Sequence, residues 1–151
     1  MSPRSRYSVQ PLSQDNHPTY EMLLEQQALS FNPANAETPL ATKTTQDKPL
    51  LGSLCYEDEH PCGLSVATVT DDLITGQRVL RLDILFLLSG VADSALAAQA
   101  LLGQAYRIAA AEKCALLQWS LLQADTALIA VCDQIQATRQ ALYRYEVEIN
   151  P

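Results

Sequence analysis

The amino-acid sequence predicts a single α/β (α+β) domain over residues 1–151, a mixed, mostly antiparallel sheet of about six strands with helices on both faces. Two observations support this fold class. Short apolar segments with strand-like spacing recur along the chain and are separated by turn residues. From Leu80 to Leu122, a strand, a helix and a second strand follow one another, which is the order of a βαβ crossover between parallel strands.

The first predicted elements are a short strand and a helix. The segment from Tyr7 to Leu12 alternates between apolar and polar residues, and Pro11 suits a strand at a sheet edge. Asp15 or Asn16 can cap a helix that has Pro18 in its first turn. The apolar residues of this helix recur three and four apart and are Tyr20, Leu23, Leu24, Ala28 and Phe31.

Two other N-terminal segments lack regular spacing. Residues 1–6 are expected to be disordered, and residues 32–49 are expected to form a long polar loop, since they include three prolines and no sustained period. Such a segment inside a compact domain is either a tolerated surface loop or a lid over a pocket. A short helix from Ala34 to Ala41 is compatible with it.

Three strands of an antiparallel meander are predicted next. The first two, Leu50–Tyr56 and Gly63–Thr70, form a hairpin around the turn-forming sequence EDEHPCG. A second turn at Asp71–Gln77 leads into a strand from Arg78 to Leu88. The apolar second half of that strand indicates burial on both faces.

The crossover helix is predicted to begin at Asp93 or Ser94 as its cap. Its apolar stripe is Ala98, Leu101, Leu102, Ala105, Ile108 and Ala109. A buried strand from Ala115 to Leu122, a helix from Asp125 to Gln136 and a final strand from Ala141 to Ile149 complete the chain. Because ligands of such crossovers bind where the first strand ends and the helix begins, a site is expected between Leu87 and Ser94.

Composition and charge restrict the partners and the location. A formal net charge of −7 argues against nucleic acid and anionic membrane surfaces, and favours a basic partner such as an amine. No apolar run is long enough for a membrane span and no secretory signal is present, so we expect a cytoplasmic protein. The four cysteines have no metal-site spacing and are expected to be reduced thiols. The less favoured alternative is a metal surrounded by Cys55, His60 and Cys62 together with residues 57–59.

The order of these elements resembles that of the GNAT superfamily of acyl-CoA-dependent N-acyltransferases. Three segments carry the resemblance, namely YSVQPLSQDN, CYEDEHPCGLSVATV and ALLGQAYRIAAAEKCALLQWSL. It implies transfer of an acyl group, such as acetyl, from acyl-CoA to a small-molecule or peptide amine. The alternative is a catalytically inactive GNAT-fold module for binding or oligomerisation, with a homodimer formed through the final strand as a sheet edge.

The signature residues of the family depart from its pattern. The family's Q/R-x-x-G-x-G/A turn, which binds the CoA diphosphate, corresponds to residues 93–98, and of these only Ala98 matches. Asp93 would repel the diphosphate, and Leu96 replaces a glycine that lets phosphate approach the backbone. The cofactor contacts that the resemblance implies are Leu87, Leu88, Val91, Asp93, Ser94, Ala95 and Ala98. An active enzyme would need a splayed cleft there, whereas an inactive module would have it filled, for example by Leu96.

The candidate catalytic residues are Asp83 and Cys132. Asp83 lies in an apolar strand, where burial would raise its pKa and suit it to act as the base, unless it pairs with Arg78 or Arg81. The family's general acid is a tyrosine, and the register puts Cys132 in its place, where a buried structural thiol is the alternative. Other candidate acids are Tyr106, Tyr143 and Tyr145.

Overall fold

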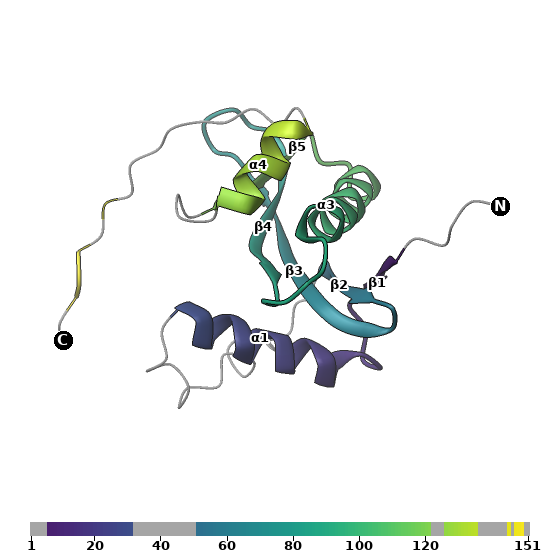
Figure 1. Cartoon of the computed structure of the whole chain (residues 1–151). Helices are drawn as coiled ribbons and strands as arrows, with labels where there is room; N and C mark the ends of the chain where they lie inside the picture. The colour runs from purple at the N-terminus through teal and green to yellow at the C-terminus, as the bar shows by residue number, and fades with distance from the viewer. Residues whose placement is uncertain (1–5, 32–50, 122–125, 136–144, 146, 150–151) are drawn as a thin grey trace.

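The computed structural model of the chain describes residues 6–31, 51–121, 126–135, 145 and 147–149. Its elements follow the predicted order (Figure 1). They are β1 (Tyr7–Pro11), α1 (His17–Phe31), β2 (Leu51–Glu57), β3 (His60–Asp71), β4 (Arg78–Leu87), α3 (Ser94–Ala111), β5 (Leu116–Trp119) and α4 (Thr126–Gln134).

The sheet is mixed and mostly antiparallel, as predicted. The strand order is β1-β2-β3-β4-β5, with antiparallel pairing throughout except between β4 and β5, which the α3 crossover makes parallel. The described part of the chain contributes five strands instead of the expected six. Part of the predicted final strand lies outside the described residues, and the described ones, Tyr145 and 147–149, are exposed and not in a strand.

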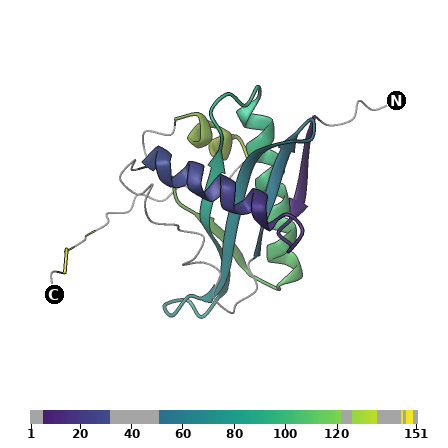
Figure 2. The ribbon, with the colours of Figure 1, turned by 90° about the horizontal axis from the view of Figure 1, so that it is seen from below.

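Helices cover both faces of the sheet, which confirms the predicted layering. Helix α1 lies on one face, and α3 and α4 lie on the other (Figures 1 and 2). On the first face, Tyr20, Leu23 and Leu24 of the predicted α1 stripe pack on β2 and β3. On the second, the stripe of α3 packs on the sheet and on α4. The largest fully buried side chains of the two layers are Tyr20, Leu23, Leu24, Leu54, Leu64, Leu80 and Leu101.

Two details of the sheet differ from the prediction. The β2–β3 hairpin turns at Asp58 and Glu59 alone, both with positive φ, so that His60 already belongs to β3. The predicted turn was too long. Most residues of EDEHPCG are unfavourable in strands, so the sequence alone does not show that the chain turns at only two of them. Strand β5 is shorter than predicted and is not fully buried, since it lies at the edge of the described sheet and Leu116 is 39% exposed.

Several other expectations fall outside the described residues. These are the disorder of most of residues 1–6, the polar loop or lid at 32–49, and the short helix from Ala34 to Ala41. None of the helices that the structure describes combines the length and the hydrophobicity needed to cross a bilayer.

Candidate functional site

A bulge interrupts the pairing of β4 with β3 at Asp83. Val66 pairs with Ile84, but its neighbour Ala67 pairs with Leu82, so Asp83 is an extra residue without a partner on β3. A bulge of this kind changes which backbone groups of the strand point to each side. It therefore decides on which side of the strand the backbone N–H and C=O groups at the end of β4 are exposed.

Two hydrogen bonds show the change in direction. Before the bulge, the carbonyl of Arg78 points toward β5 and accepts a bond from the Ala115 N–H at 2.8 Å. After the bulge, the N–H of Leu88 points toward β3 and donates to the Cys62 carbonyl at 2.8 Å. Even-numbered residues of β4 thus face β5 before Asp83 and face β3 after it.

The N–H groups of Leu85 and Leu87 consequently point away from β3. Backbone groups alternate along a strand, so these two residues face the side on which β5 pairs with β4. That pairing runs from Val79 to Leu82 and no further. Within the described residues, the end of β4 is thus an open strand edge whose donors have no acceptor from a neighbouring strand. Leu87 was predicted as a site residue, but Leu85 was missed because a bulge leaves no mark in the hydrophobic pattern.

Helix α3 begins beside this open edge and is capped as predicted. Asp93 is the N-cap, and its carboxylate accepts a bond from the Leu96 N–H at 3.1 Å. Its carbonyl accepts from the Ala97 N–H at 3.1 Å. The Leu96 side chain is 51% exposed, so it does not fill the space at the helix end.

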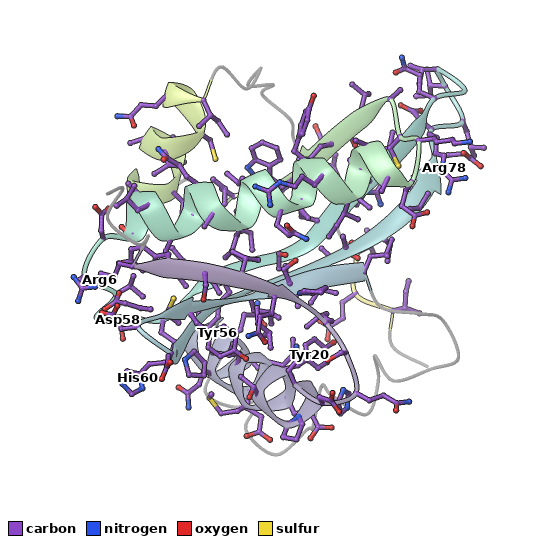
Figure 3. All side chains as sticks on the ribbon, turned by 90° about the vertical axis from the view of Figure 1, so that its right-hand side faces the viewer. Arg6, Tyr20, Tyr56, Asp58, His60 and Arg78 are labelled. Carbon is purple, nitrogen blue, oxygen red and sulfur yellow. The ribbon has the colours of Figure 1, made fainter. Side chains whose placement is uncertain are left out.

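A second carboxylate, that of Glu57 at the end of β2, also reaches the start of α3. It accepts hydrogen bonds from the Ala92 N–H at 3.2 Å and from the Tyr7 hydroxyl at 2.7 Å. The Tyr7 oxygen in turn accepts from the Asp93 N–H at 2.8 Å. Arg6 forms ion pairs of 3.2 Å with both Glu57 and Asp58. Figure 3 shows Arg6 and Asp58 side by side at the end of the sheet opposite to Arg78. We call Arg6, Tyr7, Glu57 and Asp93 the Glu57 cluster.

The Glu57 cluster predicts how stability depends on pH. The bond from Tyr7 is the main cause that lowers the pKa of Glu57 below its usual value, and the Ala92 N–H and Arg6 act in the same direction. A lowered pKa in the folded state means that Glu57 stabilises the fold above its ordinary pKa of about 4.3, and that this contribution is lost as the pH falls through the folded value. We expect the difference in melting temperature between the natural chain and Glu57→Gln to be constant above pH 5 and to shrink below about pH 4.

Circular dichroism melts of both chains from pH 3 to pH 7 measure this difference. An Asp58→Asn chain is the control, because Asp58 shares the Arg6 ion pair but no hydrogen bond to the start of α3 is found for it. A difference that stays constant down to pH 3 would contradict the role assigned to Glu57.

The structure places Asp83 on the surface. Its carboxylate accepts a hydrogen bond from the Thr68 hydroxyl at 3.1 Å, and both side chains are exposed. The burial that was expected to make it a base is therefore absent. Within the described part of the chain, the alternative ion pair with Arg78 or Arg81 is not found either, and Arg78 pairs with Glu112 at 3.4 Å.

Cys132 lies in the core that α3 shares with α4 and β5. It is 9% exposed, and its sulfur accepts a hydrogen bond from the Trp119 indole at 3.2 Å. These contacts favour the structural alternative for this thiol. Of the other candidate acids, Tyr106 lies in the C-terminal half of α3 and is 70% exposed. Tyr145 is 89% exposed. Tyr143 lies outside the described residues.

The cysteines that were considered for a metal lie below α3. Cys55 and Cys62 are buried and hydrogen-bond to each other, which raises the pKa of Cys55 and lowers that of Cys62. His60 is exposed near the hairpin tip. Over the described ranges, no three His, Cys, Asp or Glu side chains come together as a metal site.

Comparison with known proteins identifies the architecture. No family model matches the sequence, and no curated protein matches it. Solved structures match over nearly the whole chain. A ribosomal-protein-alanine N-acetyltransferase from Brucella melitensis superposes with a TM-score of 0.75 at 15% identity, covering 95% of this chain and 99% of its own. The chain has the GNAT fold.

Two further solved GNAT structures are named for acetyl transfer to aminoglycosides. One, from an uncultured soil metagenomic sample, has a TM-score of 0.76 at 10% identity and covers 97% of this chain and 99% of its own. The other, in complex with CoA, has a TM-score of 0.69 at 17% identity and covers 97% of this chain and 100% of its own. At these identities the likeness establishes the fold, and function has to be argued from the site.

The two ends of an acyl-CoA molecule fit this site differently. The open edge of β4 offers the N–H groups of Leu85 and Leu87 to a thioester and to the amides that follow it. The N-terminus of α3 suits a diphosphate less well, because the N–H groups of Ala92, Asp93 and Leu96 already donate to oxygens of the chain itself and two nearby carboxylates, Glu57 and Asp93, are negatively charged. We therefore assign no step of a reaction to CoA as a whole.

The other residues that were predicted to contact the cofactor differ in whether their backbone N–H groups are free to bind it. The N–H of Leu88 is used by β3, and Val91 packs partly buried beside the core that contains Tyr7. For the N–H groups of Ser94 and Ala95, no acceptor is found among the described residues. Ala98 is fully buried against α4 and contributes only its small size.

Proposed function

We propose that the protein is an N-acyltransferase that moves an acyl group from an acyl thioester to an amine. The observation that carries this proposal is the open edge of β4, where the bulge at Asp83 turns the N–H groups of Leu85 and Leu87 outward. Such fixed donors stabilise the negative charge that develops on a thioester oxygen during attack. The acetyltransferase structures of the same fold support the assignment.

The reaction forms an amide C–N bond, breaks the thioester C–S bond, and requires a base to take a proton from the amine. Asp83 is the carboxylate at the bulge, and Thr68 orients it through the hydroxyl hydrogen bond. It lies two residues from Leu85, which corresponds to roughly 7 Å along a strand. We therefore assign Asp83 the role of a base that acts through a bound water. The departing thiolate is protonated from solvent, since Cys132 is engaged in the core.

The acceptor class follows from charge. The chain carries a net charge of −7, which raises the local concentration of cationic amines and opposes anionic substrates. Small polyamines, aminoglycosides and the amino groups of basic peptides all belong to this class, and the acceptor specificity within it is not assigned.

The second candidate function is an inactive GNAT-fold module for binding or oligomerisation. The Glu57 cluster favours it, because two carboxylates and a tyrosine occupy the helix end where the fold family binds phosphate. The open edge of β4 favours the enzyme, because an inactive module has no need of a bulge that exposes backbone donors. A homodimer formed through residues 141–149 and a cytoplasmic location are proposed from the sequence alone.

An acylation assay distinguishes the two functions. The purified chain is incubated with S-acetyl-pantetheine or acetyl-CoA and a panel of cationic amines, and the released thiol is measured. We expect turnover with at least one amine, and Leu87→Pro should lower kcat/KM by about 10²-fold because proline removes the outward N–H. Leu87→Ala is the matched control, since it keeps the N–H. Absence of acylation with both donors would refute the enzyme proposal.

A further inference from the structure

The Glu57 cluster is built from three parts of the chain that are far apart in sequence. Tyr7 comes from β1, Glu57 from the end of β2, and Ala92 and Asp93 from the turn between β4 and α3. Tyr7 is only 5% exposed, and its hydroxyl both donates to Glu57 and accepts from the Asp93 N–H. The part-buried Tyr7 hydroxyl therefore helps to hold the Glu57 carboxylate against the helix end.

This carboxylate takes the place that a bound anion would have at the start of α3. The N-terminus of a helix attracts one negative group through its exposed N–H groups and its dipole. Here Glu57 supplies that group to Ala92, and the Asp93 carboxylate caps the Leu96 N–H. A diphosphate placed at the same point would meet two fixed negative charges. It would find the N–H groups of Ala92, Asp93 and Leu96 already bonded, and only those of Ser94 and Ala95 without an acceptor among the described residues.

The basic residue of the cluster does not relieve this repulsion. Arg6 is ion-paired with both Glu57 and Asp58, at 3.2 Å in each case. One guanidinium thus pairs with two carboxylates, and the Asp93 carboxylate at the start of α3 adds a third negative charge. The potential at the start of α3 stays negative, and a further anion is disfavoured there.

We infer that Glu57 makes the donor site insensitive to the CoA diphosphate, so that the protein recognises an acyl thioester by its pantetheine arm alone. This inference rests on the proposed function for the identity of the ligand, since pantetheine is the part of such a donor that can lie along the open edge of β4. Donors that carry the same arm without a nucleotide diphosphate are accepted as readily as acyl-CoA.

Calorimetric titration with CoA and with pantetheine tests the inference without requiring turnover. The natural chain is expected to bind CoA no more than about threefold more tightly than pantetheine. Glu57→Gln removes the charge but keeps an acceptor for Tyr7 and Ala92, and it is expected to tighten CoA binding by about tenfold or more while leaving pantetheine unchanged. Asp58→Asn is the matched control and should change CoA binding by less than about threefold. Melting curves verify that each variant is folded.

The outcomes separate the inference from the proposed function. Binding of CoA more than about 30-fold tighter than pantetheine by the natural chain, with no effect of Glu57→Gln, overturns the inference and leaves the acyltransferase proposal standing. Equal binding of both probes, tightened for CoA by Glu57→Gln, supports the inference even if no amine is acylated. Failure of every chain to bind either probe overturns both.

Discussion

Asp83→Asn is expected to lower kcat/KM for amine acylation by about 10²-fold, with the thermal midpoint unchanged. The asparagine keeps the size of the side chain and can still accept the hydrogen bond from Thr68, but it cannot take a proton from the amine. Because Asp83 is exposed and unpaired with β3, its replacement removes no packing and no strand hydrogen bond. Steady-state kinetics of both chains with the same amine and acyl donor measure the loss.

Asp71→Asn is a suitable control, since Asp71 is an exposed carboxylate at the far end of β3, opposite Arg78. It removes the same charge from the same sheet and should leave kcat/KM within about twofold of the natural value. Equal losses in both variants would show that Asp83 acts only through the net charge, and an unaffected Asp83→Asn would remove it from the mechanism.

Gly52→Ala is expected to destabilise the fold by about 3 kcal/mol or more. A Cβ at this position would lie against the backbone carbonyl oxygen of Ser65 on the paired strand, and next to the Leu12 side chain. The φ of Gly52 is +156°, which adds backbone strain for any other residue. A strand carbonyl cannot move aside without breaking the β2–β3 ladder, so the cost is not relieved by a side-chain rotation.

Gly103→Ala provides the opposite expectation within the same chain. Gly103 lies inside α3, and a Cβ there would meet nothing within 4 Å. The change should stabilise the protein by about 0.5–1 kcal/mol, because alanine loses less backbone entropy in a helix. Urea unfolding of both variants gives the two values. A Gly52→Ala chain as stable as the natural one would show that β2 and β3 can separate locally at little cost.

The sequence predicted the elements whose spacing is regular. The stripes of α1 and α3, the Asp93 cap and the crossover to β5 all follow from local periodicity and capping chemistry. The same pattern suggested the site between Leu87 and Ser94, since the end of a strand and the start of a helix are visible in one stretch of chain.

What the sequence could not predict depends on contacts between distant segments. The direction of the Leu85 N–H depends on a bulge that arises from pairing with β3, and Asp83 is exposed although its neighbours in β4 are apolar. The hydrogen bond from the Asp93 N–H to Tyr7 joins residues 86 positions apart. No local rule connects Glu57 with Ala92, so the occupied helix end could be recognised only in three dimensions.

The strand order also has a consequence for folding. Because β2, β3 and β4 are adjacent in the chain and in the sheet, their pairing closes only short loops and can form early. The bond between Tyr7 and Asp93 spans more than half of the chain, and closing so long a loop costs more entropy before any contact is gained. We therefore expect the meander to act as the folding nucleus and the Glu57 cluster, which joins β1 to the start of α3, to form after it.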